Sequence, residues 1–273
     1  MAITTFDGYI GAFKQYVQIN KTGAVTTVAG QPATTFTAAG FPGAGSAPAD
    51  TTNGVVPTDA TTGFPTIYAP AGSNTQYLSR VEAYSSVAAY MAIYDVLFWA
   101  GPTTIPTSGT TTVSLTSRPS FASRVPYMSD GVTRDWRTTE LWAWASTAWS
   151  NHAHTLSISY TDQGGTTAQS TGNVSTTNRA VNRLMRMPWA AGDYGTRDLE
   201  GYAVNGITSA TGAVVVMVMR KLWQGRIANY AQTFGPDQTG MPQVFDTSAL
   251  MLVVTPDSTS TGTPSVTLEI AEG

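Results

Sequence analysis

Six apolar residues follow one another without interruption at Val214-Val215-Val216-Met217-Val218-Met219. A short continuous apolar run of this length is typical of a β-strand that is covered on both faces. The segment from Leu250 to Val254 has the same character. The two runs therefore predict a core that is built from strands.

Three further segments alternate apolar and polar residues, which is typical of half-buried strands. They are Thr111–Thr116, His154–Tyr160 and Val266–Ile270. Alternation of this kind places every second side chain on the same face of a strand. The Asp162-Gln163-Gly164-Gly165 sequence then predicts a turn directly after the second of them.

The segment Tyr90–Trp99 is rich in aromatic and β-branched residues, which favour a strand. Gly101-Pro102 is expected to end it. The preceding Ala88-Ala89 pair would also suit a buried helix, so a helix is the alternative here.

No long amphipathic helix pattern separates these segments, which argues against alternating strands and helices. We therefore predict an all-β fold: an antiparallel β-sandwich, jelly-roll-like, over residues 76–273. Residues 1–75 are predicted to form an extended, irregular N-terminal arm.

The stretch 25–74 is dominated by Thr, Ala, Gly and Pro, and Asp50 and Asp59 are its only charged residues. Frequent Gly and Pro exclude regular helix. The stretch also carries four aromatic residues, whereas disordered segments are poor in them. We expect it to dock on a neighbouring subunit through Phe36, Phe41, Phe64 and Tyr68; a plain surface loop is the alternative.

The charge balance limits the partners. Lys and Arg number 14, Asp and Glu number 17, and charged residues make up 11% of the 273 residues, against about 25% in an average soluble domain. A net charge of −3 provides no basic surface for nucleic acid. The longest apolar stretch, Val87–Trp99, is too short to span a membrane and contains Asp95. We expect neither nucleic acid nor membrane as a partner.

Cys is absent, which excludes disulfides and thiolate metal sites. The opening Met1–Asp7 lacks the basic and apolar regions of a signal peptide, so we expect the protein to be made and assembled in a cytoplasm.

Catalytic and metal-binding motifs are not found in the sequence. His152 and His154 would share one face of a strand, but the sequence around them offers no strong third metal ligand. The Gly-x-Ser-x-Gly and P-loop patterns are absent. Asp130 and Asp193 stand in turn-like sequences, where Asp commonly bonds the backbone. We therefore expect no enzyme activity, no catalytic residues, no cofactor and no metal.

Four tryptophans form the densest aromatic patch, namely Trp136, Trp142, Trp144 and Trp149. On a strand, Trp142 and Trp144 would share one face. We expect this patch to be core or subunit interface, and a carbohydrate platform is the alternative. The local cluster Arg179, Arg183 and Arg186 is expected to take part in subunit pairing.

A series of short sequences runs in order along nearly the whole chain. It comprises residues 21–30 (KTGAVTTVAG), 41–45 (FPGAG), 54–61 (GVVPTDAT), 77–82 (YLSRVE), 94–98 (YDVLF), 119–126 (PSFASRVP), 159–166 (SYTDQGGT), 190–195 (AAGDYG) and 256–260 (PDSTS). In this order the series resembles a family of virion structural proteins of tailed bacteriophages. The resemblance implies a place in the virus particle and carries no functional residues with it.

Together with the predicted sandwich and arm, the resemblance leads us to expect a capsid decoration, or cement, protein. Its expected partners are the major capsid protein and copies of itself, as a homotrimer. The alternatives are a tail component, in the tube or the fibre base, and a carbohydrate-binding module or glycosidase that uses the Trp136–Trp149 patch.

Overall fold

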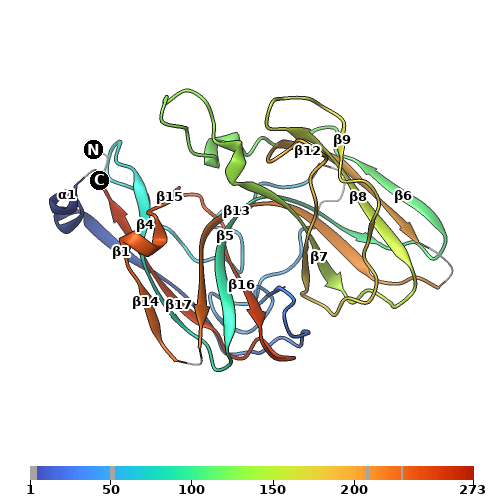
Figure 1. The fold of residues 1–273 in the computed structure, drawn as a ribbon, viewed down its shortest axis with the longest axis horizontal. Coiled ribbons are helices and arrows are strands. Elements are labelled where there is room, and N and C mark those ends of the chain that lie inside the picture. The colour runs from blue at the N-terminus through green and yellow to red at the C-terminus, as the bar shows by residue number, and fades with distance from the viewer. Residues whose placement is uncertain (1–4, 50–52, 207–208, 229) are drawn as a thin grey trace. The chain divides into compact units, whose positions relative to one another are not determined.

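The computed structural model describes residues 5–49, 53–206, 209–228 and 230–273. Over these residues the chain is almost entirely β-structure with antiparallel pairing, which confirms the predicted all-β fold class. Jelly-roll connectivity stays a prediction. Figure 1 labels the principal elements.

The chain divides into two compact units rather than an arm and one sandwich. The first comprises Met1–Ser46, Thr58–Asp95 and Lys221–Gly273, and the second comprises Ala47–Pro57 and Val96–Arg220. Two long strands each contribute to both units: β5 (Ala89–Thr104) and β13 (Ala213–Ile227).

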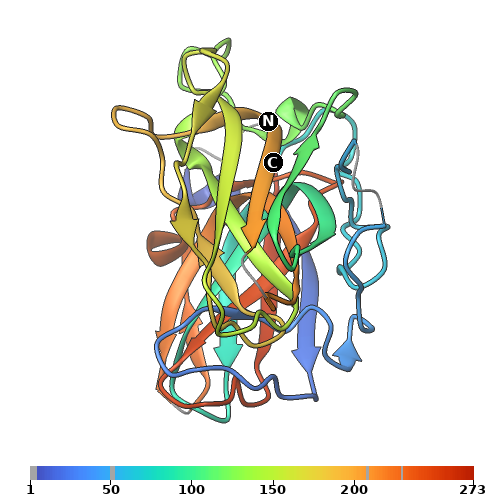
Figure 2. The same cartoon turned by 90° about the vertical axis from the view of Figure 1, so that its right-hand side faces the viewer.

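The first unit contains a sheet with the order β14-β4-β17-β1-β3. Its strands are β1 (Phe13–Lys21), β3 (Gly40–Phe41), β4 (Gln76–Tyr84), β14 (Gln232–Phe234) and β17 (Ser265–Glu272), and β15 (Gln243–Val244) also pairs with β4. Figures 1 and 2 show β1, β17 and β4 side by side.

The second layer of this unit pairs the first half of β5 with β16 (Leu250–Pro256), and β16 with β2 (Ala33–Thr34). Side chains from both layers, such as Val17, Leu268, Ile93 and Leu252, pack in one hydrophobic core. The short helices are α1 (Phe6–Gly11) and α2 (Pro236–Thr239).

The second unit is also a two-layered sandwich. One sheet has the order β10-β8-β12-β6, built from β6 (Gly109–Ser114), β8 (His154–Asp162), β10 (Val174–Ser175) and β12 (Thr196–Gly206), and β9 (Gln169–Ser170) also pairs with β8. In the other layer, β7 (Thr139–Thr147) pairs with β13 and with β11 (Leu184–Arg186). The two short 3₁₀ helices are η1 (Ala122–Arg124) and η2 (Trp136–Thr138).

All the strands predicted from sequence are present. Tyr90–Trp99 lies in β5, so the alternative of a buried helix is wrong. The expected end of the strand at Gly101-Pro102 is also wrong, because β5 continues through these residues to Thr104. Val214 to Met219 are all at most 1% exposed, as expected of a strand that is covered on both faces. His154–Tyr160 and Val266–Ile270 lie within β8 and β17.

The division of the chain differs from the expected boundary at residue 75. Residues of the expected arm form β1, which pairs over its length with β17 near the other end of the sequence. Within the stretch 25–74, Ala33–Thr34 pairs with β16, and Val55 forms a backbone bridge with Trp99. The stretch is therefore packed on its own chain in both units. Whether it also contacts a neighbouring subunit stays a prediction.

Candidate functional site

The four aromatic residues of the 25–74 stretch fall into two pairs. Phe36 and Phe64 are buried in the first unit, at 3% and 4% exposed, with their ring centroids 4.6 Å apart. Phe41 and Tyr68 are 59% and 73% exposed. Of the four, only Phe41 and Tyr68 present a ring that a partner could cover without rearrangement of this chain.

The four tryptophans are all buried in the second unit, and Trp136, at 8% exposed, is the most accessible of them. Trp142 and Trp144 share one face of β7, as predicted, and Leu141 and Ala143 belong to the hydrophobic core of the unit. Sugar stacking needs an open ring face, which the buried Trp142, Trp144 and Trp149 do not offer, so these tryptophans do not form a carbohydrate platform.

The two histidines do not converge. His154 is buried, and its Nδ1 lies 2.9 Å from the carbonyl oxygen of His152, whose side chain is exposed. In the described ranges, no three His, Asp or Glu side chains gather as a metal site would require.

Within the same ranges, no helix has the length and apolar character to cross a membrane.

The outer face of the first sheet presents polar and aromatic side chains from several strands. It is made of side chains from β1, β17 and β4 that point away from the core: Tyr16, Gln18, Asn20, Ser265, Thr267, Glu269, Arg80, Glu82 and Tyr84. Tyr16 and Tyr84 are 59% and 44% exposed. We call this set the outer sheet face.

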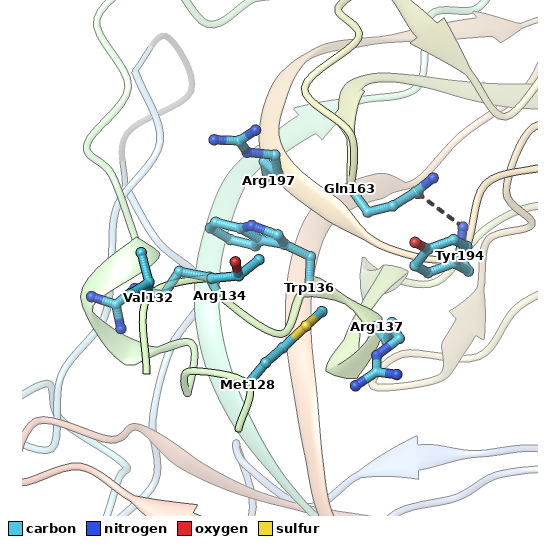
Figure 3. Close-up of a pocket in the computed structure, with 9 residues that line it drawn as sticks. Met128, Val132, Arg134, Trp136, Arg137, Gln163, Tyr194 and Arg197 are labelled. Atoms are coloured by element: carbon cyan, nitrogen blue, oxygen red, sulfur yellow. Dashed lines mark hydrogen bonds between the residues drawn. The ribbon is translucent and has the colours of Figure 1, made fainter. Parts of the chain in front are cut away.

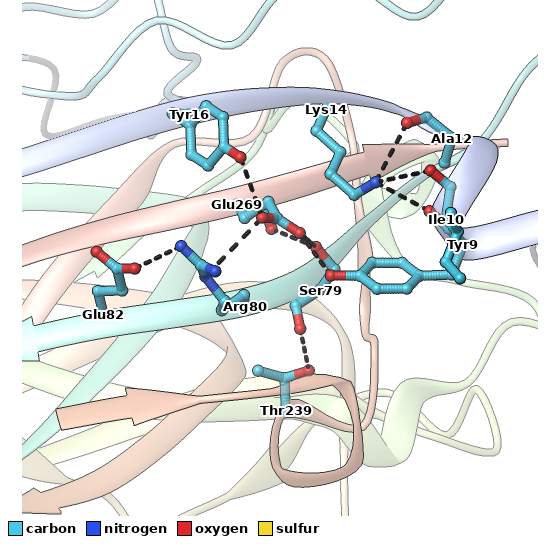
Figure 4. Close-up of polar contacts among 10 residues, drawn as sticks. All are labelled: Tyr9, Ile10, Ala12, Lys14, Tyr16, Ser79, Arg80, Glu82, Thr239 and Glu269. Atoms are coloured by element: carbon cyan, nitrogen blue, oxygen red, sulfur yellow. Dashed lines mark hydrogen bonds and ion pairs between the residues drawn. The ribbon is translucent and has the colours of Figure 1, made fainter. Parts of the chain in front are cut away.

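Glu269 is the one deeply buried member of the outer sheet face, at 4% exposed (Figure 4). Its carboxylate accepts hydrogen bonds from the hydroxyls of Tyr9 at 2.7 Å, Ser79 at 2.8 Å and Tyr16 at 3.3 Å. Burial alone would raise the pKa of Glu269, but the bonds from Tyr9 and Ser79, with the charge of Arg80, hold it below its usual value. The Glu269 side chain is therefore an ionised carboxylate that holds the hydroxyls of Tyr9, Ser79 and Tyr16 in place.

Arg80 offsets part of the negative charge of this surface. Its guanidinium forms an ion pair with Glu82, and its Nε lies 3.9 Å from Oε2 of Glu269. The remaining side chains of the outer sheet face are neutral hydroxyls, amides and tyrosine rings. A surface with few unpaired charges and with exposed tyrosines is typical of protein–protein contacts.

Helix α1 lies against this surface through Tyr9 (Figure 4). Thr5 caps the helix by accepting a 3.0 Å hydrogen bond from the backbone N–H of Gly8. At the other end, the Lys14 ammonium donates to the carbonyls of Tyr9, Ile10 and Ala12 at 3.0 to 3.4 Å. Ile10 is left 59% exposed beside the outer sheet face.

The second unit has a pocket of about 340 Å³ (Figure 3). It is lined by Met128, Val132, Thr133, Arg134, Trp136, Arg137, Gln163, Tyr194 and Arg197. These residues come from three separate parts of the sequence, 128–137, 163 and 194–197, so no single local motif signals the pocket. The basic cluster predicted from sequence lies elsewhere: Arg183 is buried, and Arg186 lies 3.6 Å from Glu140.

Comparison with known proteins finds no matching family model and no matching curated protein. Among solved structures, the chain is similar to the VP2 subviral particle of infectious bursal disease virus, at 12% identity and a TM-score of 0.20, covering 95% of this chain and 79% of that chain. A structure of the Gt strain of that virus matches at 12% identity and a TM-score of 0.18, covering 95% and 80%. TM-scores of this size do not establish a shared fold.

Proposed function

We propose that the protein is a non-enzymatic structural component of a bacteriophage particle, and that it decorates and stabilises the outside of the head. Its partners are then the major capsid protein and further copies of itself, arranged as trimers. Two features of the chain support the proposal: the ordered series of sequences that resembles tailed-phage virion proteins, and a surface suited to protein contact.

The observation that carries the proposal is the chemistry of the outer sheet face. Its one arginine, Arg80, lies beside both of its carboxylates, Glu82 and Glu269, and its other exposed side chains are tyrosines, amides and hydroxyls. Removing water from such a surface costs little free energy, and the rings of Tyr16 and Tyr84 add contact area. Stable contacts of this kind bury about 1,200–2,000 Å² in total.

The direct test measures binding of the purified full chain to purified heads that lack it. We choose the double variant Gln18→Glu/Tyr84→Ala, which places an unpaired charge on the outer sheet face and removes a ring. Both side chains are exposed, so the fold should be unaffected. The matched control is Gln224→Glu, an exposed glutamine on β13.

The proposal predicts that the wild type and Gln224→Glu bind heads equally, and that the double variant binds at least tenfold more weakly. Equal binding of all three proteins would show that the outer sheet face is not the contact. Wild-type protein that binds tails and not heads would overturn the assignment to the head in favour of a tail component.

A further inference from the structure

The pocket of the second unit is rich in hydrogen-bond donors and contains no carboxylate. Three of its nine lining residues are arginines, and none is Asp or Glu, all nine lying within the described chain. Its volume of about 340 Å³ is at the lower end of the range of small-molecule sites. It is therefore sized for one small ligand that accepts hydrogen bonds.

The positive charge of Arg197 is not paired with a carboxylate of the described residues. Arg197 is exposed, and within the described residues its guanidinium makes no hydrogen bond or ion pair. Figure 3 shows it above the ring of Trp136, with 5.7 Å between Cζ and the ring centroid. It also lies against Gly165, where an added β-carbon would come within 2.8 Å of Nη1. The guanidinium is thus held at the pocket with its donors open to a ligand.

The other two arginines are already engaged. Arg137 pairs with both oxygens of Asp135, at 2.7 and 3.0 Å. Arg134 donates to the carbonyl of Val125 at 2.6 Å and stacks on Tyr127. Arg134 adds positive potential to the pocket, whereas Asp135 offsets the charge of Arg137, and Arg197 is the residue positioned to bind an anion directly.

Neutral groups complete the pocket. The side-chain oxygen of Gln163 accepts the backbone N–H of Tyr194 at 3.0 Å, which leaves the Gln163 amide N–H₂ as a donor. The ring of Tyr194 is 53% exposed, and Met128 and Trp136 supply further apolar wall. Donors beside aromatic and thioether surface match a ligand that has both polar edges and an apolar face.

We propose that this pocket binds an acidic sugar, whose carboxylate pairs with Arg197 and whose ring lies against Tyr194. A planar guanidinium can bind a carboxylate through two parallel hydrogen bonds. A carboxylate side chain from another protein would leave most of the pocket empty, whereas an acidic sugar also brings a ring that can lie against Tyr194. The site is independent of whether the protein decorates a virus head.

The test is calorimetric titration of the full chain with a disaccharide that contains glucuronic acid, at low ionic strength. Its neutral counterpart built from glucose, sodium acetate and a short poly-glutamate peptide are titrated in parallel. The variants are Arg197→Gln and Tyr194→Ala. The matched control is Arg226→Gln, an exposed arginine in the first unit that lies 5.2 Å above the ring of Tyr90.

We expect the acidic disaccharide to bind at least tenfold more tightly than the neutral one and than acetate. Arg197→Gln and Tyr194→Ala should each weaken it by about tenfold, and Arg226→Gln should leave it unchanged. The proposal is overturned if the acidic disaccharide does not bind, if the neutral disaccharide or acetate binds as tightly, if the acidic peptide binds better, or if both pocket variants bind like the wild type.

Discussion

The hydroxyl of Tyr9 donates a 2.7 Å hydrogen bond to the carboxylate of Glu269, and this bond joins helix α1 to a strand 260 positions later in the sequence. A bond to a buried charged acceptor is worth more than an ordinary one. It therefore accounts for the position of a helix of only six residues, which is too short to be stable alone.

Replacing this tyrosine tests the attachment of α1. We expect Tyr9→Phe to lower the free energy of unfolding by about 1–2 kcal/mol, and to speed amide exchange in α1. Because the bond depresses the folded-state pKa of Glu269 below 4.5, its contribution is present above pH 4.5 and is lost as the pH falls through the lower, folded-state pKa. Urea unfolding at pH 7 and at a series of pH values below 4.5 measures both effects; a difference between wild type and variant that does not shrink anywhere in the acid series would contradict this interpretation.

Lys21 should make the folding stability depend on pH in the alkaline range rather than the acid range. It is 1% exposed, and its ammonium donates to the carbonyls of Pro42 at 2.8 Å and Ala38 at 3.3 Å. Burial lowers the pKa of Lys21 from 10.5 to about 8. Between these two pH values the unfolded chain binds a proton that the folded chain does not, so the wild type should gain stability as the pH rises.

The comparison is with Lys21→Met, which has no titrating group at this position. The free energy of unfolding of the wild type, relative to the variant, should rise between pH 8 and 10.5 by up to about 3 kcal/mol. Urea unfolding at closely spaced pH values measures the difference. A difference that does not change with pH would show that Lys21 titrates normally in the folded protein.

Gly54 and Gly131 form a matched pair for testing how the 47–57 segment packs. Both have positive φ, at +71° and +67°. A β-carbon on Gly54 would lie 2.1 Å from the ring of Phe98, whereas one on Gly131 would meet nothing within 4 Å. We expect Gly54→Ala to cost about 1–3 kcal/mol more than Gly131→Ala, because only the first overpacks the core. Equal losses of stability in thermal unfolding would mean that this segment is not packed on β5.

Phe64 and Tyr68 distinguish a core role from an interface role within the 25–74 stretch. Phe64→Ala should cost about 3–5 kcal/mol because it leaves a cavity beside Phe36. Tyr68→Ala should change the stability by less than about 0.5 kcal/mol, but should weaken binding to heads if the exposed ring contacts a partner. Chemical unfolding together with a head-binding assay checks both. The interface role of Tyr68 fails if that binding is unchanged.

The sequence predicted the fold class because the periodicity of burial is local. Val214–Met219 and Val266–Ile270 show their burial pattern within a few residues, and both are strands. The two-unit division was not predictable in this way, since β5 and β13 run without interruption from one unit into the other. Nothing in the local sequence marks the change at Asp95 or Arg220.

The candidate sites were harder to predict for the same reason. An aromatic ring such as Phe36 has the same sequence character as Tyr68, and only tertiary packing buries one and exposes the other. The outer sheet face and the pocket both depend on pairing between distant segments. Glu269, for example, gains its role from Tyr9 and Ser79, which stand far away in the sequence.

The central claim is that this chain lies on the head of a virus particle and contacts it through the outer sheet face. Electron cryo-microscopy of the particle that contains the protein tests this most directly. The claim predicts trimeric density of this two-unit fold on the outside of the head, with Tyr16, Gln18 and Tyr84 turned toward a neighbouring subunit. Density for the chain in the tail, or none anywhere in the particle, would contradict it.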